Sequence, residues 1–177
     1  RSLIIFGQGA IRCHPYAFDE LSALMENDTA KFDKNFFKHV GFALRNACRS
    51  VILSATRGHL AKVPGGPMRQ YYRKLSWSSA TFAFMADLAL GSYGGGLTMK
   101  EKLSGRYADA LSWMYLISAT LHRFESEGRR KDHEVYVQYA CEYGFIRIQT
   151  AFEGIFSNIE IPLQMLEGVP QDKGPII

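Results

Sequence analysis

Histidine and cysteine are the residues best suited to metal binding or nucleophilic catalysis, and this chain carries five histidines and three cysteines. The histidines show no metal-ligand spacing, and the cysteines form no C-x-x-C pair, so neither a zinc site nor a disulfide framework is indicated. His122 and Glu125 are spaced to share a helical face, but a carboxylate-bridged metal site needs a second such pair, which is absent. The five histidines are His14, His39, His59, His122 and His133, and the three cysteines are Cys13, Cys48 and Cys141.

No combination of side chains predicts a catalytic centre. Cys13 stands next to His14, but adjacent residues rarely orient for thiol activation, and no third group is evident. Cys48 and Cys141 lie on or near apolar stripes, so we expect both in the core. No Ser-His-Asp set and no paired carboxylates emerge. We therefore expect this chain to hold no catalytic, cofactor-binding or metal-binding residue.

Two glycine-rich stretches match phosphate-binding loops only in part. Gly7 and Gly9 begin a G-x-G-x-x-G pattern, but Arg12 stands where the third glycine belongs, and no strand precedes it. The three glycines at residues 94–96 lack the Lys-Ser/Thr of a P-loop. We interpret the first stretch as a helix end and the second as a turn between helices.

The distribution of charge is the strongest compositional feature. The formal net charge is +4, yet residues 34–86 contain nine Lys and Arg and no Asp or Glu. Such a stretch favours contact with an anionic membrane, an acidic protein surface or phosphate groups. Aromatic residues lie among these charges, a mixture found in nucleic-acid platforms, membrane-contacting tips and solvated basic loops. We expect five basic residues to form one anion-contacting tip: Arg57, Lys62, Arg69, Arg73 and Lys74.

We expect the basic residues to lie on or between helices, because helical periodicity dominates the sequence and no hairpin signal competes with it. A short helix is expected to start at Pro15, since proline is favoured at the first helical position. Residues 27–29 (Asn-Asp-Thr) end it and cap a long helix that stops at Gly58. That long helix carries an apolar stripe at Phe32, Phe36, Val40, Leu44, Ala47, Val51 and Ala55.

Three further long helices follow the loop at residues 63–67 (Val-Pro-Gly-Gly-Pro). Their boundaries are the glycines at residues 94–96, a stop at Gly128, a cap at Asp132, and a final stop at residues 161–162 (Ile-Pro). Short connections make neighbouring helices antiparallel. The sequence therefore predicts an all-α fold: an antiparallel up-and-down helical bundle of four long helices plus a short N-terminal helix.

Composition places the chain among ordinary globular proteins, with 177 residues, 47% of them hydrophobic. No apolar run approaches the roughly 18 residues needed to span a bilayer, and the start does not match a signal peptide. An odd number of distant cysteines favours a reducing compartment. We expect a cytoplasmic protein, with peripheral attachment to the inner membrane as an open alternative.

Several segments resemble, in the same order, the C-terminal extension of bacterial long-chain (FadE-type) acyl-CoA dehydrogenases. The first, at residues 1–16, is the most specific, and the others cover most of the remaining chain. The segments are RSLIIFGQGAIRCHPY, FKHVGFALRNACRSVILSATRG, YYRKLSWSSATFAFMADLALGSYGGGL, KEKLSGRYADALSWMYLISATLHRFESEGR and QTAFEGIFSNI.

The resemblance implies an enzyme that uses FAD to oxidise long-chain acyl-CoA to trans-2-enoyl-CoA in fatty-acid β-oxidation. The family's catalytic glutamate, acyl pocket and most of its flavin site precede the position of Arg1, so no catalytic residue is carried over. Residues 1–13 would end the core helix and linker, residues 14–162 would form the helical bundle, and residues 163–177 a tail. The chain's own upstream catalytic domain and a second copy in a homodimer are the implied partners.

Two hypotheses follow. The first is a non-catalytic C-terminal part of such an enzyme, inactive alone, which packs on the catalytic core, extends the dimer interface and presents its basic tip to membrane lipid. The second is a free-standing helical module that binds an acidic partner or nucleic acid through its basic half. A start without Met, inside an apolar run, favours the first, and we then expect no nucleic acid as partner.

Overall fold

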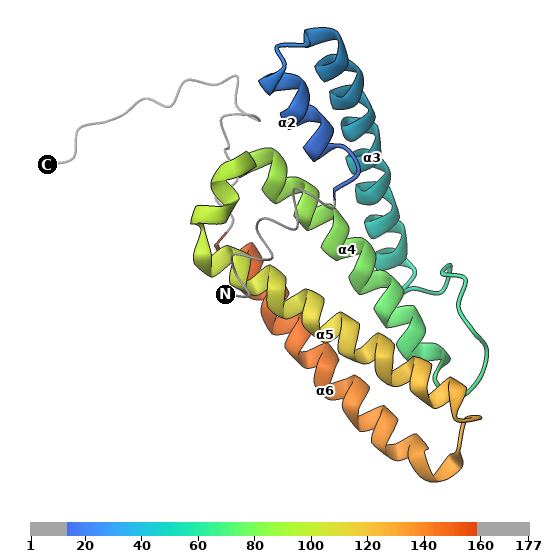
Figure 1. Ribbon diagram of the computed structural model, residues 1–177. Coiled ribbons are helices and arrows are strands. Elements are labelled where there is room, and N and C mark those ends of the chain that lie inside the picture. The colour runs from blue at the N-terminus through green and yellow to red at the C-terminus, as the bar shows by residue number, and fades with distance from the viewer. Residues whose placement is uncertain (1–13, 159–177) are drawn as a thin grey trace, which may run out of the picture.

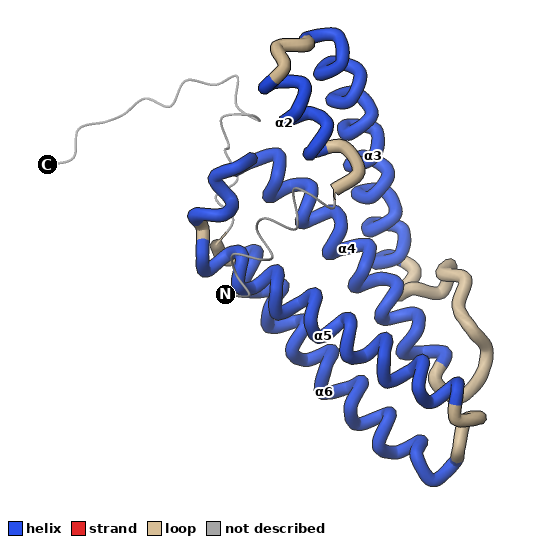
Figure 2. Tube along the Cα trace, viewed as in Figure 1, coloured by secondary structure: helices blue, strands red, loops and turns tan. Residues whose placement is uncertain are grey.

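The computed structural model describes residues 14–158, and every regular element in this range is a helix (Figures 1 and 2). This confirms the all-α fold class. None of these helices is both long enough and apolar enough to cross a membrane. The expected parts at residues 1–13 and 163–177 lie outside the described range, as does the stop at residues 161–162. The elements are α2 (Ala17–Met25), α3 (Thr29–Ala55), α4 (Arg69–Tyr93), the 3-10 helix η1 (Gly94–Met99), α5 (Glu101–Ser126) and α6 (Lys131–Phe156).

The start of α3 confirms the predicted cap, whereas α2 begins slightly later than expected. The Asp28 carboxylate accepts a hydrogen bond from the Lys31 backbone N–H at 3.0 Å, which satisfies one free amide of the first turn. Helix α2 begins at Ala17 rather than Pro15. Its first free amides are satisfied by a histidine ring, because Nδ1 of His14 accepts from the N–H groups of Tyr16 and Ala17.

Gly58 ends the α3 segment, as its position predicted. Its φ of +74° is a left-handed conformation that glycine adopts without steric cost. Its N–H donates to the Leu53 carbonyl at 2.7 Å. A Cβ at this position would lie 2.7 Å from the Arg73 carbonyl oxygen, so the end of α3 is closely packed against α4.

The start of α6 differs from the expectation that Asp132 caps it. The helix already begins at Lys131, and the capping residue, Arg130, makes no side-chain cap hydrogen bond. Asp132 lies inside the first turn, and its carboxylate accepts from the Arg130 guanidinium, with Nε at 3.1 Å from Oδ1. The predicted cap was therefore wrong, because a neighbouring arginine binds the carboxylate.

Helices α4, α5 and α6 enclose the core, and α3 packs along α4 at its outer side with α2 beside it (Figure 1). The closest pairing is the α5–α6 hairpin. Gly144 of α6 allows this approach, because a Cβ there would lie 2.8 Å from Ile117. The core forms two groups of buried side chains. One contains Met68, Tyr71, Met114, Ile117, Leu121, Phe124, Val137, Cys141 and Ile148; the other contains Met85, Ala89, Leu90, Leu97, Leu103, Tyr107 and Ile155.

Helix α3 turns a mixed face of apolar and polar side chains inward and leaves much of its apolar stripe exposed. Only Ser50 and Leu53 are buried along its length. Asn46 and Ser50 bond to α4, and His39 bonds to α2. Cys48 is exposed, so its expected place in the core was wrong. We call the exposed apolar residues the α3 ridge: Phe36, Phe37, Val40, Leu44 and Val51, between 45% and 71% accessible.

Candidate functional site

The predicted basic residues lie around the corner between α3 and α4. Arg57 follows the end of α3 with φ +48°, Lys62 lies in the connecting segment, and Arg69 begins α4. All three side chains are exposed. They are placed for contact with an anionic partner, which remains a prediction.

Arg73 and Lys74 have other surroundings. The Arg73 side chain is half-buried, and its Nε is the one buried side-chain nitrogen or oxygen without a hydrogen-bond partner within the described range. Nζ of Lys74 lies 5.8 Å from the Tyr71 ring centroid and 5.7 Å from that of Phe145. This places the ammonium over aromatic rings of α4 and α6.

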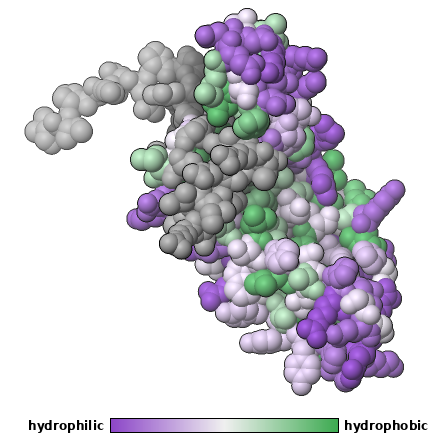
Figure 3. Space-filling model, in the orientation of Figure 1, coloured by the Kyte–Doolittle hydropathy of each residue, from purple (hydrophilic) through white to green (hydrophobic). Residues whose placement is uncertain are grey.

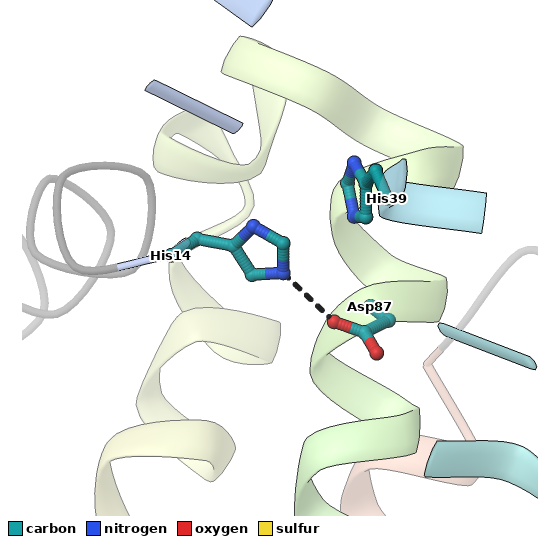
Figure 4. A group of neighbouring side chains, drawn as sticks. All are labelled: His14, His39 and Asp87. Carbon is teal, nitrogen blue, oxygen red and sulfur yellow. Dashed lines mark hydrogen bonds and ion pairs between the residues drawn. The ribbon is translucent and has the colours of Figure 1, made fainter. Parts of the chain in front are cut away.

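The fold brings together three ionisable side chains that the sequence gave no reason to group. His14, His39 and Asp87 each offer a potential ligand atom, and these atoms lie within 4.8 Å of one another (Figure 4). Nε2 of His14 is 3.0 Å from Oδ1 of Asp87, and both side chains are more than 90% buried. Asn46 donates to the other carboxylate oxygen at 2.9 Å, and His39 Nδ1 lies 2.9 Å from the Glu20 carboxylate.

The backbone fixes the hydrogen-bonding roles in this cluster. Because Nδ1 of His14 accepts from two backbone N–H groups, at 3.1 and 3.3 Å, its ring proton must sit on Nε2. That proton is donated to Asp87. Nδ1 of His39 faces a carboxylate that can only accept, so it carries a proton too. Asp87 therefore accepts one hydrogen bond at each oxygen.

These roles do not suit a preformed metal site. A metal on Nε2 of His14 would move the ring proton to Nδ1, where it would oppose the N–H groups of Tyr16 and Ala17. Zinc at about 2.0–2.1 Å from each ligand would also hold the ligand atoms roughly 3.4 Å apart. The cluster instead joins the segment before α2 to α4 through the His14–Asp87 bond, and α4 to α3 through the Asp87–Asn46 bond.

Between α3, α4 and α6 lies an apolar groove of about 670 Å³. Phe145, Phe152 and Phe156 of α6 line one wall. On the other side, Trp77 donates through Nε1 to Ser54 Oγ at 2.7 Å, which fixes the indole at the groove. Figure 3 shows hydrophilic side chains gathered at the α2–α3 end and the α5–α6 end, with hydrophobic side chains between them.

The groove and the α3 ridge are exposed and largely apolar. On α3, Val51 of the ridge follows the groove residue Ser50 and precedes Ser54 by three positions, so ridge and groove lie on neighbouring sides of the helix. Large exposed apolar patches mark binding surfaces in folded proteins. Cys141 is the buried thiol of the core, and burial raises its pKa to about 11. That thiol is poorly suited to act as a nucleophile.

A family described as "Acyl-CoA dehydrogenase, C-terminal, bacterial type" matches residues 11–166, which is most of the chain. No solved structure matches the chain.

Proposed function

Because the chain belongs to the family of C-terminal domains of bacterial-type acyl-CoA dehydrogenases, we propose that it is the non-catalytic helical part of a FAD-dependent enzyme. That enzyme oxidises long-chain acyl-CoA to trans-2-enoyl-CoA in fatty-acid β-oxidation. Its FAD and its catalytic base belong to the upstream catalytic part, and this chain alone is inactive.

The exposed apolar surface of α3 is the observation that supports a packing role. Phe37, Leu44 and Val51 of the α3 ridge are 71%, 64% and 67% accessible, while polar residues of the same helix face inward. Burying such side chains contributes about 1.5–3 kcal/mol each. We assign the α3 ridge and the groove beside it to contact with the upstream catalytic part.

Two further contacts belong to the proposal. A second exposed stripe on α6, formed by Tyr136, Tyr139, Tyr143 and Ile146, is assigned to the partner copy in a homodimer. The exposed basic residues at the α3–α4 corner are assigned to peripheral contact with the cytoplasmic surface of the inner membrane.

Hydroxyl-radical footprinting tests the packing role directly. The isolated chain is compared with the longer enzyme that contains it, and oxidation of side chains is read by mass spectrometry. We expect Phe37, Leu44 and Trp77 to be protected in the enzyme. Tyr115, 72% accessible and outside the ridge and groove, is the reference. Equal oxidation of the ridge residues in both samples would refute the assignment.

A pair of variants tests the same contact through the association of the enzyme's two parts. Leu44→Asp with Val51→Asp places two carboxylates on the α3 ridge, and we expect the enzyme's two parts to separate after limited proteolysis. Tyr115→Asp with Leu111→Asp makes the same charge change on exposed positions of α5. This control should leave the parts associated.

A further inference from the structure

A second hollow lies at the α3–α4 contact, lined by α3 residues different from those that line the apolar groove. Its volume is about 520 Å³. Arg45 and Arg49, one helical turn apart, line it together with Lys62 from the connecting segment. Ser76 of α4 adds a hydroxyl group. Three cationic side chains thus converge on one concave surface.

Within residues 14–158, no carboxylate balances the positive charge of this hollow. Among residues 14–158, no ion pair with a carboxylate involves Arg45, Arg49 or Lys62. The surrounding sequence, residues 34–86, contributes no Asp or Glu. The Arg45 guanidinium faces the Phe42 ring, whose centroid lies 6.0 Å from Cζ. Like charges one helical turn apart repel, so a bound anion would relieve an unfavourable arrangement.

The chemistry of the lining indicates a phosphate group attached to a larger molecule. Guanidinium forks bind phosphate oxygens in a bidentate manner, and an ammonium adds a point charge. Ile52 and Leu60 supply apolar wall beside the cations. The volume exceeds that of bare phosphate and falls in the range of small-molecule sites. We propose that this hollow binds a phosphate ester through Arg45, Arg49 and Lys62.

This site is distinct from the predicted basic tip, with which it shares only Lys62. It also does not depend on the proposed role in an acyl-CoA dehydrogenase. The phosphate ester has two sources, the headgroup of an anionic phospholipid or a soluble phosphorylated compound. A soluble phosphate ester and phospholipid vesicles, used as separate probes, distinguish these two sources.

The soluble probe is glycerol 3-phosphate, with glycerol as the matched compound without phosphate. Binding to the full chain is followed by NMR of the arginine side-chain Nε–Hε signals. The membrane probe is sedimentation with phosphatidylglycerol vesicles, compared with phosphatidylcholine vesicles. The test variant is Arg45→Gln with Arg49→Gln. The control, Lys34→Gln with Lys38→Gln, makes the same charge change on exposed residues of the same helix outside the hollow.

We expect glycerol 3-phosphate, but not glycerol, to shift the Arg45 and Arg49 signals saturably. Loss of two charge-assisted contacts should weaken this binding by at least about tenfold in the test variant, and by less than about threefold in the control. Sedimentation with phosphatidylglycerol that only the test variant loses identifies lipid as the source. Glycerol 3-phosphate binding without such sedimentation identifies a soluble ester.

Three results would overturn the proposal. They are no saturable shift together with phosphatidylglycerol sedimentation that the test variant retains, equal shifts with glycerol, and equal weakening in the test and control variants. Circular dichroism verifies that each variant remains folded. If the double arginine variant does not fold, Lys62→Gln in the connecting segment replaces it, and unchanged binding of glycerol 3-phosphate by this variant would also refute the site.

Discussion

Replacing Asp87 with alanine should destabilise the fold strongly, because the buried His14 ring and the half-buried Asn46 amide lose their shared acceptor. The carboxylate accepts from Nε2 of His14 at 3.0 Å and from Nδ2 of Asn46 at 2.9 Å, and its side chain is 4% accessible. A buried donor without a partner costs about 1–3 kcal/mol. We therefore expect Asp87→Ala to lower the free energy of unfolding by about 2–5 kcal/mol.

Urea unfolding of the full chain, followed by circular dichroism, measures this loss. The matched control is Asp109→Ala, which removes a carboxylate that is 61% accessible and 3.9 Å from Arg106. Such an exposed pair contributes less than about 1 kcal/mol. If Asp87→Ala costs no more than Asp109→Ala, the hydrogen-bonded cluster does not stabilise the fold as described.

A double-mutant cycle and zinc addition separate hydrogen bonding from metal binding. His14→Ala combined with Asp87→Ala should cost less than the sum of the single losses, because both remove the same bond. Zinc should not raise the unfolding free energy of the wild-type chain. A saturable zinc-dependent stabilisation that Asp87→Ala abolishes would contradict the inferred position of the His14 ring proton.

Three other predictions concern packing, pH and cleavage. Gly41→Ala, with no atom within 4 Å of the new Cβ, should stabilise exposed α3 by about 0.5–1 kcal/mol, whereas Gly144→Ala should destabilise the α5–α6 contact by about 1–2 kcal/mol in the same urea assay. Burial raises the pKa of the Cys141 thiol to about 11, so the folded state favours the neutral thiol. The stability that this preference contributes is complete below the thiol pKa of the unfolded chain and is lost as pH rises through 11. Cys141→Ala should therefore make the unfolding free energy fall less steeply between about pH 9 and 11. Trypsin should cut first after Lys62, in the segment before the exposed Pro-Gly-Gly-Pro loop, and a first cut elsewhere in the Lys62→Gln variant would support this assignment.

Local signals in the sequence predicted the helices well, because they act within a few residues. Asp28 caps α3 through a contact three residues away, and Gly58 and Gly128 have the positive φ values that favour glycine at helix ends. Asp132 failed as a cap because the competing Arg130 side chain is a local detail that capping preference does not rank.

The candidate site depended on contacts that periodicity alone does not reveal. His14, His39 and Asp87 come from three separate segments, and their meeting follows from how α2 packs on α3 and α3 on α4. An apolar stripe shows that a helix is amphipathic, but it does not say which partner covers that face. The sequence therefore predicted the apolar stripe of α3, but only the structure shows that this stripe is exposed.

Activity of the longer polypeptide that contains this chain is the most decisive measurement. We expect that polypeptide to bind FAD and to oxidise palmitoyl-CoA to its trans-2-enoyl product with an external electron acceptor. The isolated 177-residue chain should do neither. A longer polypeptide without flavin or acyl-CoA oxidation, or an isolated chain that purifies with stoichiometric flavin, would contradict the assignment.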